Sequence, residues 1–312
     1  MFCPPLPAVL AMLIGGLLVP GYARAAPAAA SIHPPAAASA SHRDVYRFRI
    51  GALDAVALRD GEIIAPNDGT TFGVGQSTAA VGALLAAAGQ PTDALHLGIQ
   101  PLLVHWQKRV LLFDTGAGDA SFAHGGHLPA AMRAAGVAPS QVTDIFLSHR
   151  HRDHIGGLLT HSGALAFPNA TIHISSPEWK ALEAEHESVA IVAAIRPRVD
   201  TFAPGAAIIP GVVSAINIPG HTPGHSAFEI VSGGERLLYI GDVVHHYVIS
   251  VQRPAWTVEY DEDASLAQAS RRAELTSLAE SNERVYAVHF PFPGLGHVAK
   301  RGDSFVWEPE GP

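Results

Sequence analysis

One segment of this 312-residue chain, Ser148-His149-Arg150-His151-Arg152-Asp153-His154, gathers three histidines and an aspartate behind the apolar run Ile145-Phe146-Leu147. These side chains therefore lie where a buried strand is predicted to end. Imidazole nitrogens and carboxylate oxygens are ligands that borderline divalent metals prefer. The first two histidines can face one position, and the aspartate and last histidine a second. The segment predicts a metal site; the alternative is a solvated loop in a chain with 18 histidines.

Later segments repeat this arrangement. A strand-like run at residues 212–218 leads to His221, a second run leads to Asp242, and a third leads to His289. Each candidate ligand thus follows a predicted strand. This repetition favours a metal site over a loop of surface histidines.

The whole pattern resembles the metallo-β-lactamase superfamily, from about Val45 to Trp307. The motif HxHxDH is followed, in family order, by a single histidine, aspartate and histidine. Four segments further resemble the methyl parathion hydrolase branch, which contains secreted bacterial phosphotriesterases: Val110–Gly116, Ala166–Ala170, Gly220–His225 and His289–His297. The resemblance implies an α/β (α+β) fold, an αββα four-layer sandwich with the metal site along one edge.

By this resemblance the chain binds two divalent ions, with zinc as the first choice and iron, manganese or cobalt as alternatives. One ion is expected on His149, His151 and His221, the other on Asp153, His154 and His289, with Asp242 as the bridge. A metal-bridging hydroxide would be the nucleophile, because two metals lower the pKa of a shared water toward about 7. Asp242 and Asp153 are the expected catalytic side chains, and Asp153 is expected to pass a proton to the leaving group.

Three residues are expected to support the ligands from behind: Asp114, His225 and His297. In the family the position of Asp114 orients ligand histidines, although an Asx turn would also explain an aspartate there. His225 and His297 belong to the motifs but have no free place among the ligands. We therefore interpret both as hydrogen-bonding scaffold.

A substrate pocket with aromatic walls is expected beside the metals. Its candidate residues are Phe290, Phe292, Trp179 and Trp256, which could enclose an aryl or acyl group. For the two tryptophans, burial in the core is the alternative. The loops at residues 119–129 and 247–256 are expected to shape this pocket.

His245 is the remaining pocket candidate. It stands three residues after Asp242, where lactonases of the superfamily carry a tyrosine that assists the substrate carbonyl. His245 could donate a hydrogen bond to a developing oxyanion, or it could pack against the strand edge.

The first 43 residues are not expected to belong to the folded domain. Residues 1–25 contain an apolar core and the small-residue site Ala23-Arg24-Ala25, which together predict a signal peptide and a periplasmic or secreted protein. An uncleaved anchor or a misassigned start codon is the alternative. Residues 26–43 form a flexible leader rich in alanine and proline, and residues 44–312 the hydrolase domain. The single cysteine, Cys3, lies in the segment that would be removed.

Charge and composition exclude some partners. The net charge of −8 and the lack of a basic stripe argue against nucleic-acid binding. The expected partner is a small-molecule substrate, without a stable membrane partner after cleavage; a homodimer is suggested by the resemblance alone.

Several elements are predicted from periodicity and turn residues. A half-buried strand contains Tyr46, Phe48 and Ile50, and Asp60-Gly61 is predicted as a hairpin turn. A second hairpin joins residues 102–106 to 109–113. Helices are predicted at Leu128 to Ala135, Pro177 to Ala190 and Ala264 to Glu280, the last behind Asp263 as its cap.

The expected function is a dinuclear metal-dependent hydrolase acting on a neutral ester-like bond, either a lactone or an aryl phosphotriester. No lysine or arginine occurs in the ligand motifs after Arg152 to bind a phosphate monoester. Diiron oxygen reductases of the superfamily have glutamate at the position of His151, so hydrolysis is expected rather than redox chemistry. The alternatives are a β-lactamase-like amidase and a non-catalytic metal-binding module.

Overall fold

The computed structural model describes residues 44–310. The predicted signal peptide and leader lie outside the described residues and stay predictions. The strands are β1 Val45–Ile50, β2 Leu53–Leu58, β3 Gly61–Pro66, β4 Phe72–Val74, β5 Ala94–Ile99, β6 Leu102–Trp106, β7 Arg109–Phe113, β8 Asp144–Phe146, β9 Thr171–Ser175, β10 Val199–Phe202, β11 Ala207–Ile209, β12 Val213–Asn217, β13 Ser226–Ser232, β14 Glu235–Tyr239, β15 Thr257–Val258, β16 Val285–Tyr286, β17 Leu295–Arg301 and β18 Ser304–Pro309. The helices are α1 Thr78–Ala87, α2 Leu128–Ala135, α3 Arg152–Ile155, α4 Ser176–Ala184, α5 Val189–Ile195, α6 Ile249–Gln252 and α7 Ala264–Ser281.

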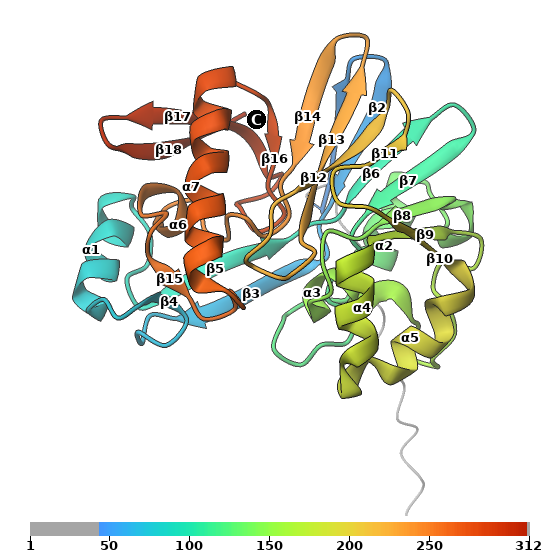
Figure 1. Cartoon of the computed structure of the whole chain (residues 1–312), viewed down its shortest axis with the longest axis horizontal. Helices are drawn as coiled ribbons and strands as arrows, with labels where there is room; N and C mark the ends of the chain where they lie inside the picture. The colour runs from blue at the N-terminus through green and yellow to red at the C-terminus, as the bar shows by residue number, and fades with distance from the viewer. Residues whose placement is uncertain (1–43, 311–312) are drawn as a thin grey trace, which may run out of the picture. The chain divides into compact units, whose positions relative to one another are not determined.

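Two large sheets form the centre of the described domain (Figure 1). The first has the order β1-β2-β6-β7-β8-β9-β10 and the second the order β11-β12-β13-β14-β16-β17-β18. Their facing sides share one core, in which the rings of Phe113 and Phe146 stack 4.8 Å apart and Phe228 reaches both from the other sheet. Burial of such large apolar side chains is the main force that holds the sheets together.

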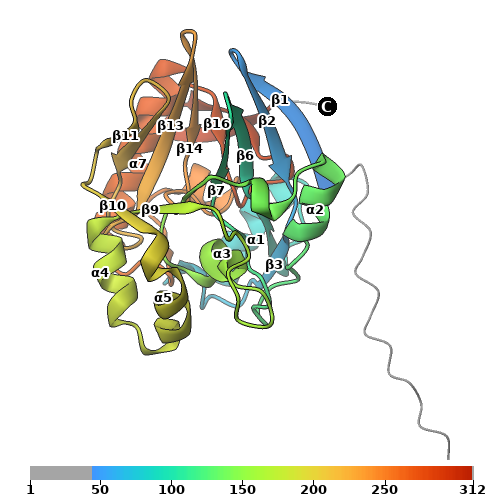
Figure 2. The same cartoon turned by 90° about the vertical axis from the view of Figure 1, so that its right-hand side faces the viewer.

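Helices cover the outer side of each sheet. Those on the first sheet include α2, α4 and α5 (Figure 2). Their residues Met132, Leu182 and Ile191 join a second core with Ile145 and Ile172. On the second sheet, α7 contributes Leu275 and Leu278 to a third core. The layers are therefore helix, sheet, sheet, helix, and the predicted αββα sandwich is confirmed.

Several predicted elements agree with the structure to within one residue. β6 and β7 form the expected hairpin, with Gln107 at φ 53° in the turn. Helix α2 ends before Gly136, which adopts the left-handed conformation with φ 80°. The side chain of Asp263 caps α7 by accepting from the N–H of Leu266. Local capping and turn chemistry is sufficient to locate these boundaries.

Two local predictions are wrong. The single helix predicted at residues 177–190 is two helices, because Glu185 leaves α4 in an extended conformation and its carboxylate pairs with Arg150. Asp60-Gly61 does not close a hairpin: β2 pairs with β1 and β6, whereas β3 pairs with β5. Asp60 is buried instead and accepts from the N–H of Ala117 in a loop and from the N–H of Leu128, the first residue of α2.

A smaller unit adjoins the sandwich. It consists of the two-stranded sheets β3-β5 and β15-β4, and α1 packs on it through Val81 and Leu85. Among residues 44–310, no helix is both long and apolar enough to cross a bilayer.

Candidate metal centre

The candidate ligands come from loops that follow strands of both sheets. β8 leads to the loop and short helix of the first motif, β12 leads to His221, and β14 and β16 lead to Asp242 and His289. Glycines allow two of these turns. Gly220, at φ 125°, would place a Cβ 2.3 Å from the nitrogen of Ala267, and Gly241, at φ 52°, would place one 2.6 Å from a ring nitrogen of His225. A larger residue would displace the ligand that follows it.

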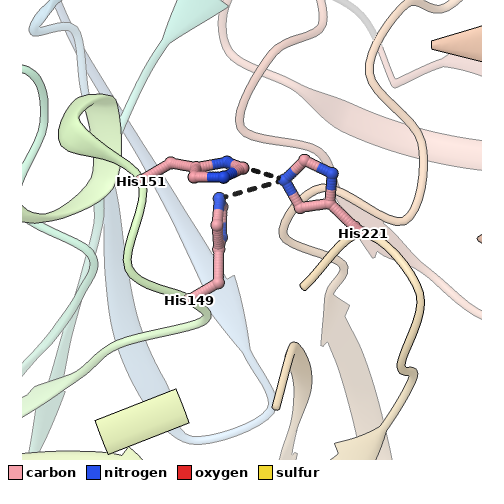
Figure 3. A group of neighbouring side chains, drawn as sticks. All are labelled: His149, His151 and His221. Atoms are coloured by element: carbon pink, nitrogen blue, oxygen red, sulfur yellow. Dashed lines mark hydrogen bonds between the residues drawn. The ribbon is translucent and has the colours of Figure 1, made fainter. Parts of the chain in front are cut away.

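His149, His151 and His221 form the first group of inward-facing nitrogens (Figure 3). The Nε2 atom of His221 lies 3.2 Å from Nε2 of His149 and 3.0 Å from Nδ1 of His151. All three rings point toward one another, and two of them are fully buried. A cation shared by the three nitrogens is the arrangement that these contacts fit.

Asp153, His154 and His289 form the second group. The Nε2 atoms of His154 and His289 are 3.3 Å apart, and Oδ2 of Asp153 lies 3.5 and 3.4 Å from them. Asp242 lies between the two groups. Its Oδ1 is 3.2 Å from His154, while its Oδ2 is 3.2 Å from His289 and 3.5 Å from His221.

The outer hydrogen bonds determine which ring nitrogens face inward without a proton. Nδ1 of His154 faces a carboxylate oxygen of Asp114 at 2.7 Å, and Nδ1 of His289 faces the carbonyl of Gly98 at 2.7 Å. Carboxylates and carbonyls only accept, so each Nδ1 donates its hydrogen. The Nε2 lone pairs then point into the cluster, as metal binding requires.

The pKa shifts of the cluster are consistent with a cation-binding site. Burial, assisted by neighbouring histidines, lowers the pKa of His151 to about 3, and burial also lowers the pKa of His149. Both rings are neutral at pH 7 and can act as ligands. Burial would lower the pKa of His154 too, but Asp242, Asp153 and Asp114 outweigh it and raise this pKa. The carboxylates thus create a field that favours a cation.

Two of the three predicted supporting residues contact the cluster. Asp114 is buried and accepts from the N–H and hydroxyl of Ser148, from Nδ1 of His154 and from the hydroxyl of Tyr239. His225 accepts the N–H of Asp242 on its Nε2 at 2.9 Å. The supporting role expected for His297 is wrong, because this half-exposed residue of β17 donates to the carbonyl of Asn282 and contacts no cluster residue.

The sequence interpretation missed two buried carboxylates. Glu178 accepts from Thr222 and Gly224 of the His221 loop and from the N–H of Arg150 in the first motif, so it ties the two ligand loops together. Asp261 accepts from Nδ1 of His221 at 3.1 Å. Neither residue stands in a motif; Glu178 looks in sequence like an ordinary acidic residue in the first turn of a helix.

A cavity of about 480 Å³ opens above the cluster, with His151, Asp153, His221, Asp242 and His289 in its base. Its apolar side is lined by β3, β4 and β5 together with two loop residues, and the side chains that form it are Ile63, Ile64, Ala65, Pro66, Phe72, Leu97, Phe122 and Tyr260. Phe122 belongs to the predicted pocket-shaping loop at 119–129. No residue of the loop at 247–256 lines the cavity.

The aromatic wall predicted from sequence is wrong. Phe290 packs inside the third core, with its ring 4.8 Å from that of Trp307, and Phe292 packs against the core between the sheets. Trp179 lies against the first sheet under Arg196, and Trp256 lies against Gly73 in the smaller unit. Each of these rings is used for packing.

His245 does line the cavity. Its side chain is buried, its Nε2 lies 3.5 Å from Oδ2 of Asp242, and neither ring nitrogen has a hydrogen-bond partner within residues 44–310. Burial lowers its pKa, so the ring is neutral at pH 7 and carries one N–H donor. A buried polar group without a partner is uncommon in folded proteins and calls for an explanation.

Comparisons with known proteins agree with this geometry. The sequence model of the metallo-beta-lactamase superfamily matches residues 102–289. AidC, a dizinc quorum-quenching lactonase solved with a product, is similar to this chain at 30% identity, with a TM-score of 0.81 over 86% of this chain and 98% of that one. Hydrolase AbOPH of the beta lactamase superfamily is also 30% identical, with a TM-score of 0.78 over 88% and 99% of the two chains.

A more distant structure supports the fold alone. A probable metal-dependent hydrolase from Staphylococcus aureus is 19% identical, with a TM-score of 0.71 over 85% of this chain and all of that one. Among curated proteins no match was found. The resemblance to the methyl parathion hydrolase branch stays a prediction. The family model, the 30% identical structures and the groups of histidine and aspartate able to bind metal together show that this chain belongs to the metallo-β-lactamase superfamily.

Proposed function

We propose that this protein is a dinuclear metallohydrolase that opens acyl lactones. The observation that carries the proposal is the position of the histidine and aspartate cluster in the base of a largely apolar cavity. His149, His151 and His221 would hold one ion, Asp153, His154 and His289 the other, and Asp242 would contact both. The donor set suits zinc, iron, manganese or cobalt, and zinc is the first choice by analogy with AidC.

The two ions, when bound, would supply hydroxide at neutral pH and polarise the substrate oxygen. The side chains of the protein supply the remaining functions. Asp114 and Ser148 hold the inward rings of His154 and His149 in one orientation, which preorganises the site. Asp153 lies in the base of the cavity, where its carboxylate could take the proton of the attacking hydroxide and pass it to the leaving alkoxide.

His245 would stabilise negative charge on the substrate. Its neutral imidazole lines the cavity next to Asp242, and its buried ring nitrogens have no hydrogen-bond partner within residues 44–310. A donor aimed at the oxygen where charge develops lowers the barrier, and loss of one such donor costs about 100- to 1000-fold in kcat. We therefore assign His245 the role of hydrogen-bond donor to the substrate rather than that of a metal ligand.

The charge of the cavity favours a neutral substrate. Arg152 is the only lysine or arginine that lines it within the described part of the chain, and it faces Asp119 at 3.7 Å. A phosphate monoester dianion needs a cationic clamp that this arrangement does not supply. Neutral esters, lactones and phosphotriesters need none.

Two observations favour a lactone over an aryl phosphotriester. AidC was solved with N-hexanoyl-L-homoserine, and its chain is similar over nearly its whole length. The apolar side of the cavity also continues to partly exposed residues at its mouth, Ile64, Phe122 and Tyr260. A surface of this shape can hold an acyl chain that extends outward.

The test is a metal analysis followed by a substrate panel. Purified protein loaded with zinc, manganese or cobalt should bind close to two ions per chain. On that preparation, kcat/KM should be highest for an N-acyl homoserine lactone, lower for an aryl dialkyl phosphotriester, and lower by at least about tenfold for an aryl phosphate monoester and a penicillin.

Each failure has a distinct meaning. One ion or none after loading contradicts the dinuclear site. Two ions with no turnover of any substrate indicates the non-catalytic metal-binding module. A penicillin as the best substrate indicates the β-lactamase-like amidase, and a phosphotriester as the best substrate changes the proposed substrate but keeps the site.

A further inference from the structure

Arg271 of α7 is a charged side chain with no exposed surface. Its guanidinium donates to the carbonyls of Val243 at 2.9 Å and Pro254 at 3.2 Å, and to Oδ2 of Asp261 at 2.7 Å. An arginine stays protonated in a protein, and a buried charge without a partner is costly. Asp261 is therefore the carboxylate that neutralises Arg271.

The other oxygen of Asp261 faces the metal cluster. Oδ1 lies 3.1 Å from Nδ1 of His221. An ionised carboxylate only accepts, so Nδ1 carries the hydrogen and Nε2 presents its lone pair to His149 and His151. The backbone of His221 is held by the same turn, since its carbonyl accepts from the N–H of Glu262 at 3.1 Å.

We propose that Asp261, clamped by Arg271, is a positioning residue for His221 and sets the metal affinity of the group formed by His149, His151 and His221. This inference rests on the proposed dinuclear site. A carboxylate behind a ligand imidazole fixes its tautomer and raises the basicity of the inward nitrogen, and its loss typically costs about 10- to 100-fold in metal affinity.

The decisive variant is Asp261→Asn, which keeps the size of the side chain and removes its charge. Holoenzyme is titrated with a chromophoric chelator, and the dissociation constants of both ions are measured. We expect one ion to bind about 10- to 100-fold more weakly and the other to be unchanged. Excess metal should restore kcat without a change in KM, which a general loss of structure would not allow.

The chain contains a matched control. Asp144 also lies buried between an arginine and a histidine, with Nε of Arg109 at 2.8 Å and Nε2 of His173 at 3.0 Å, but this trio contacts none of the proposed ligands. Asp144→Asn should lower thermal stability and leave both dissociation constants unchanged. A variant at Asp261 that behaves like this control overturns the proposal.

A second variant tests the proposal independently if the first variant does not fold. Arg271→Lys keeps the positive charge but loses the forked geometry that orients Asp261. It should weaken the same ion by a smaller factor. Unchanged affinity for both ions, or equal weakening of both, contradicts the proposal. Wild-type protein that binds fewer than two ions contradicts the proposed function instead, so the two failures are distinguishable.

Discussion

The base of the cavity and its apolar side are built in different ways. We call the whole histidine and aspartate cluster the floor; it consists of the five base residues His151, Asp153, His221, Asp242 and His289 together with His149 and His154, which do not line the cavity. We call the apolar side the wall, formed by Ile63, Ile64, Ala65, Pro66, Phe72, Leu97, Phe122 and Tyr260. Floor side chains are mostly buried, and most are held by directional bonds from residues such as Asp114 and Asp261. Wall side chains make non-directional contacts, and Phe122 and Tyr260 are more than half exposed.

In the proposed function, the floor would carry out the reaction and the wall would select the substrate. A floor held by hydrogen bonds tolerates little displacement, because ligand geometry and proton positions depend on a few tenths of an ångström. A wall of apolar contacts can change residue by residue at a cost of about 1–3 kcal/mol in substrate binding. We therefore expect floor variants to change metal content and kcat, and wall variants to change KM and substrate length preference.

The largest effect is expected from the floor. His151→Ala should remove about one metal ion and lower kcat by roughly a thousandfold or more, because the hydroxide and the polarisation of the substrate both depend on the ions. Elemental analysis and kinetics on one preparation check this. His186→Ala, an exposed histidine outside the cluster, is the control and should change neither value. Full metal content in the His151 variant would contradict its place in the floor.

His245 tests the boundary between the two regions. His245→Phe should lower kcat about a hundredfold with metal content still near two, because a donor is lost and no ligand is lost. His245→Gln keeps an N–H donor and should recover part of the rate. Loss of a metal ion in either variant would instead make His245 a ligand together with His221 and Asp242, which lie within reach.

A smaller effect is expected from the wall. Phe122→Ala should raise KM for a long-chain acyl lactone roughly fivefold and leave kcat unchanged, because only part of the ring can be covered by substrate. A short-chain lactone should be nearly unaffected. Val189→Ala removes an apolar side chain that is 60% exposed and does not line the cavity, so it serves as the control. A fall in kcat for both the long-chain and the short-chain lactone would contradict the assignment of Phe122 to substrate binding alone.

The smallest effect lies outside both regions and concerns stability alone. Burial beside Glu283 raises the pKa of Glu274 on α7 from 4.5 to about 7. The folded state therefore holds this proton more tightly than the unfolded state, and stability falls as the pH rises from about 4.5 to above 7. Glu274→Gln should raise the free energy of unfolding at pH 8 by on the order of 1–2 kcal/mol, and little at pH 4.5. Urea unfolding at the two pH values measures this; an equal effect at both would contradict it.

The floor could be predicted from sequence because its residues follow strands at fixed spacings. The HxHxDH spacing and the single candidate ligands at 221, 242 and 289 are local patterns, and strand ends on two packed sheets meet at one edge. The wall could not be predicted this way. Phe290 follows a residue that faces the cavity, but adjacent side chains point in different directions, and its ring is packed in the core.

Local sequence is enough to locate the short-range caps such as Asp263 and Gly136, because these depend on neighbours within a few residues. The motifs at strand ends are enough to indicate the fold and the candidate ligands. Three other features depend on contacts between segments far apart in the chain. They are the wall, the hydrogen bonds of Glu178 to the His221 loop, and the contacts that connect Arg271 through Asp261 to His221. The packing of the sheets and loops decides which glutamate and which phenylalanine reach the site. A buried charge requires a partner, and an apolar ring packs into the hydrophobic core that lies beside it.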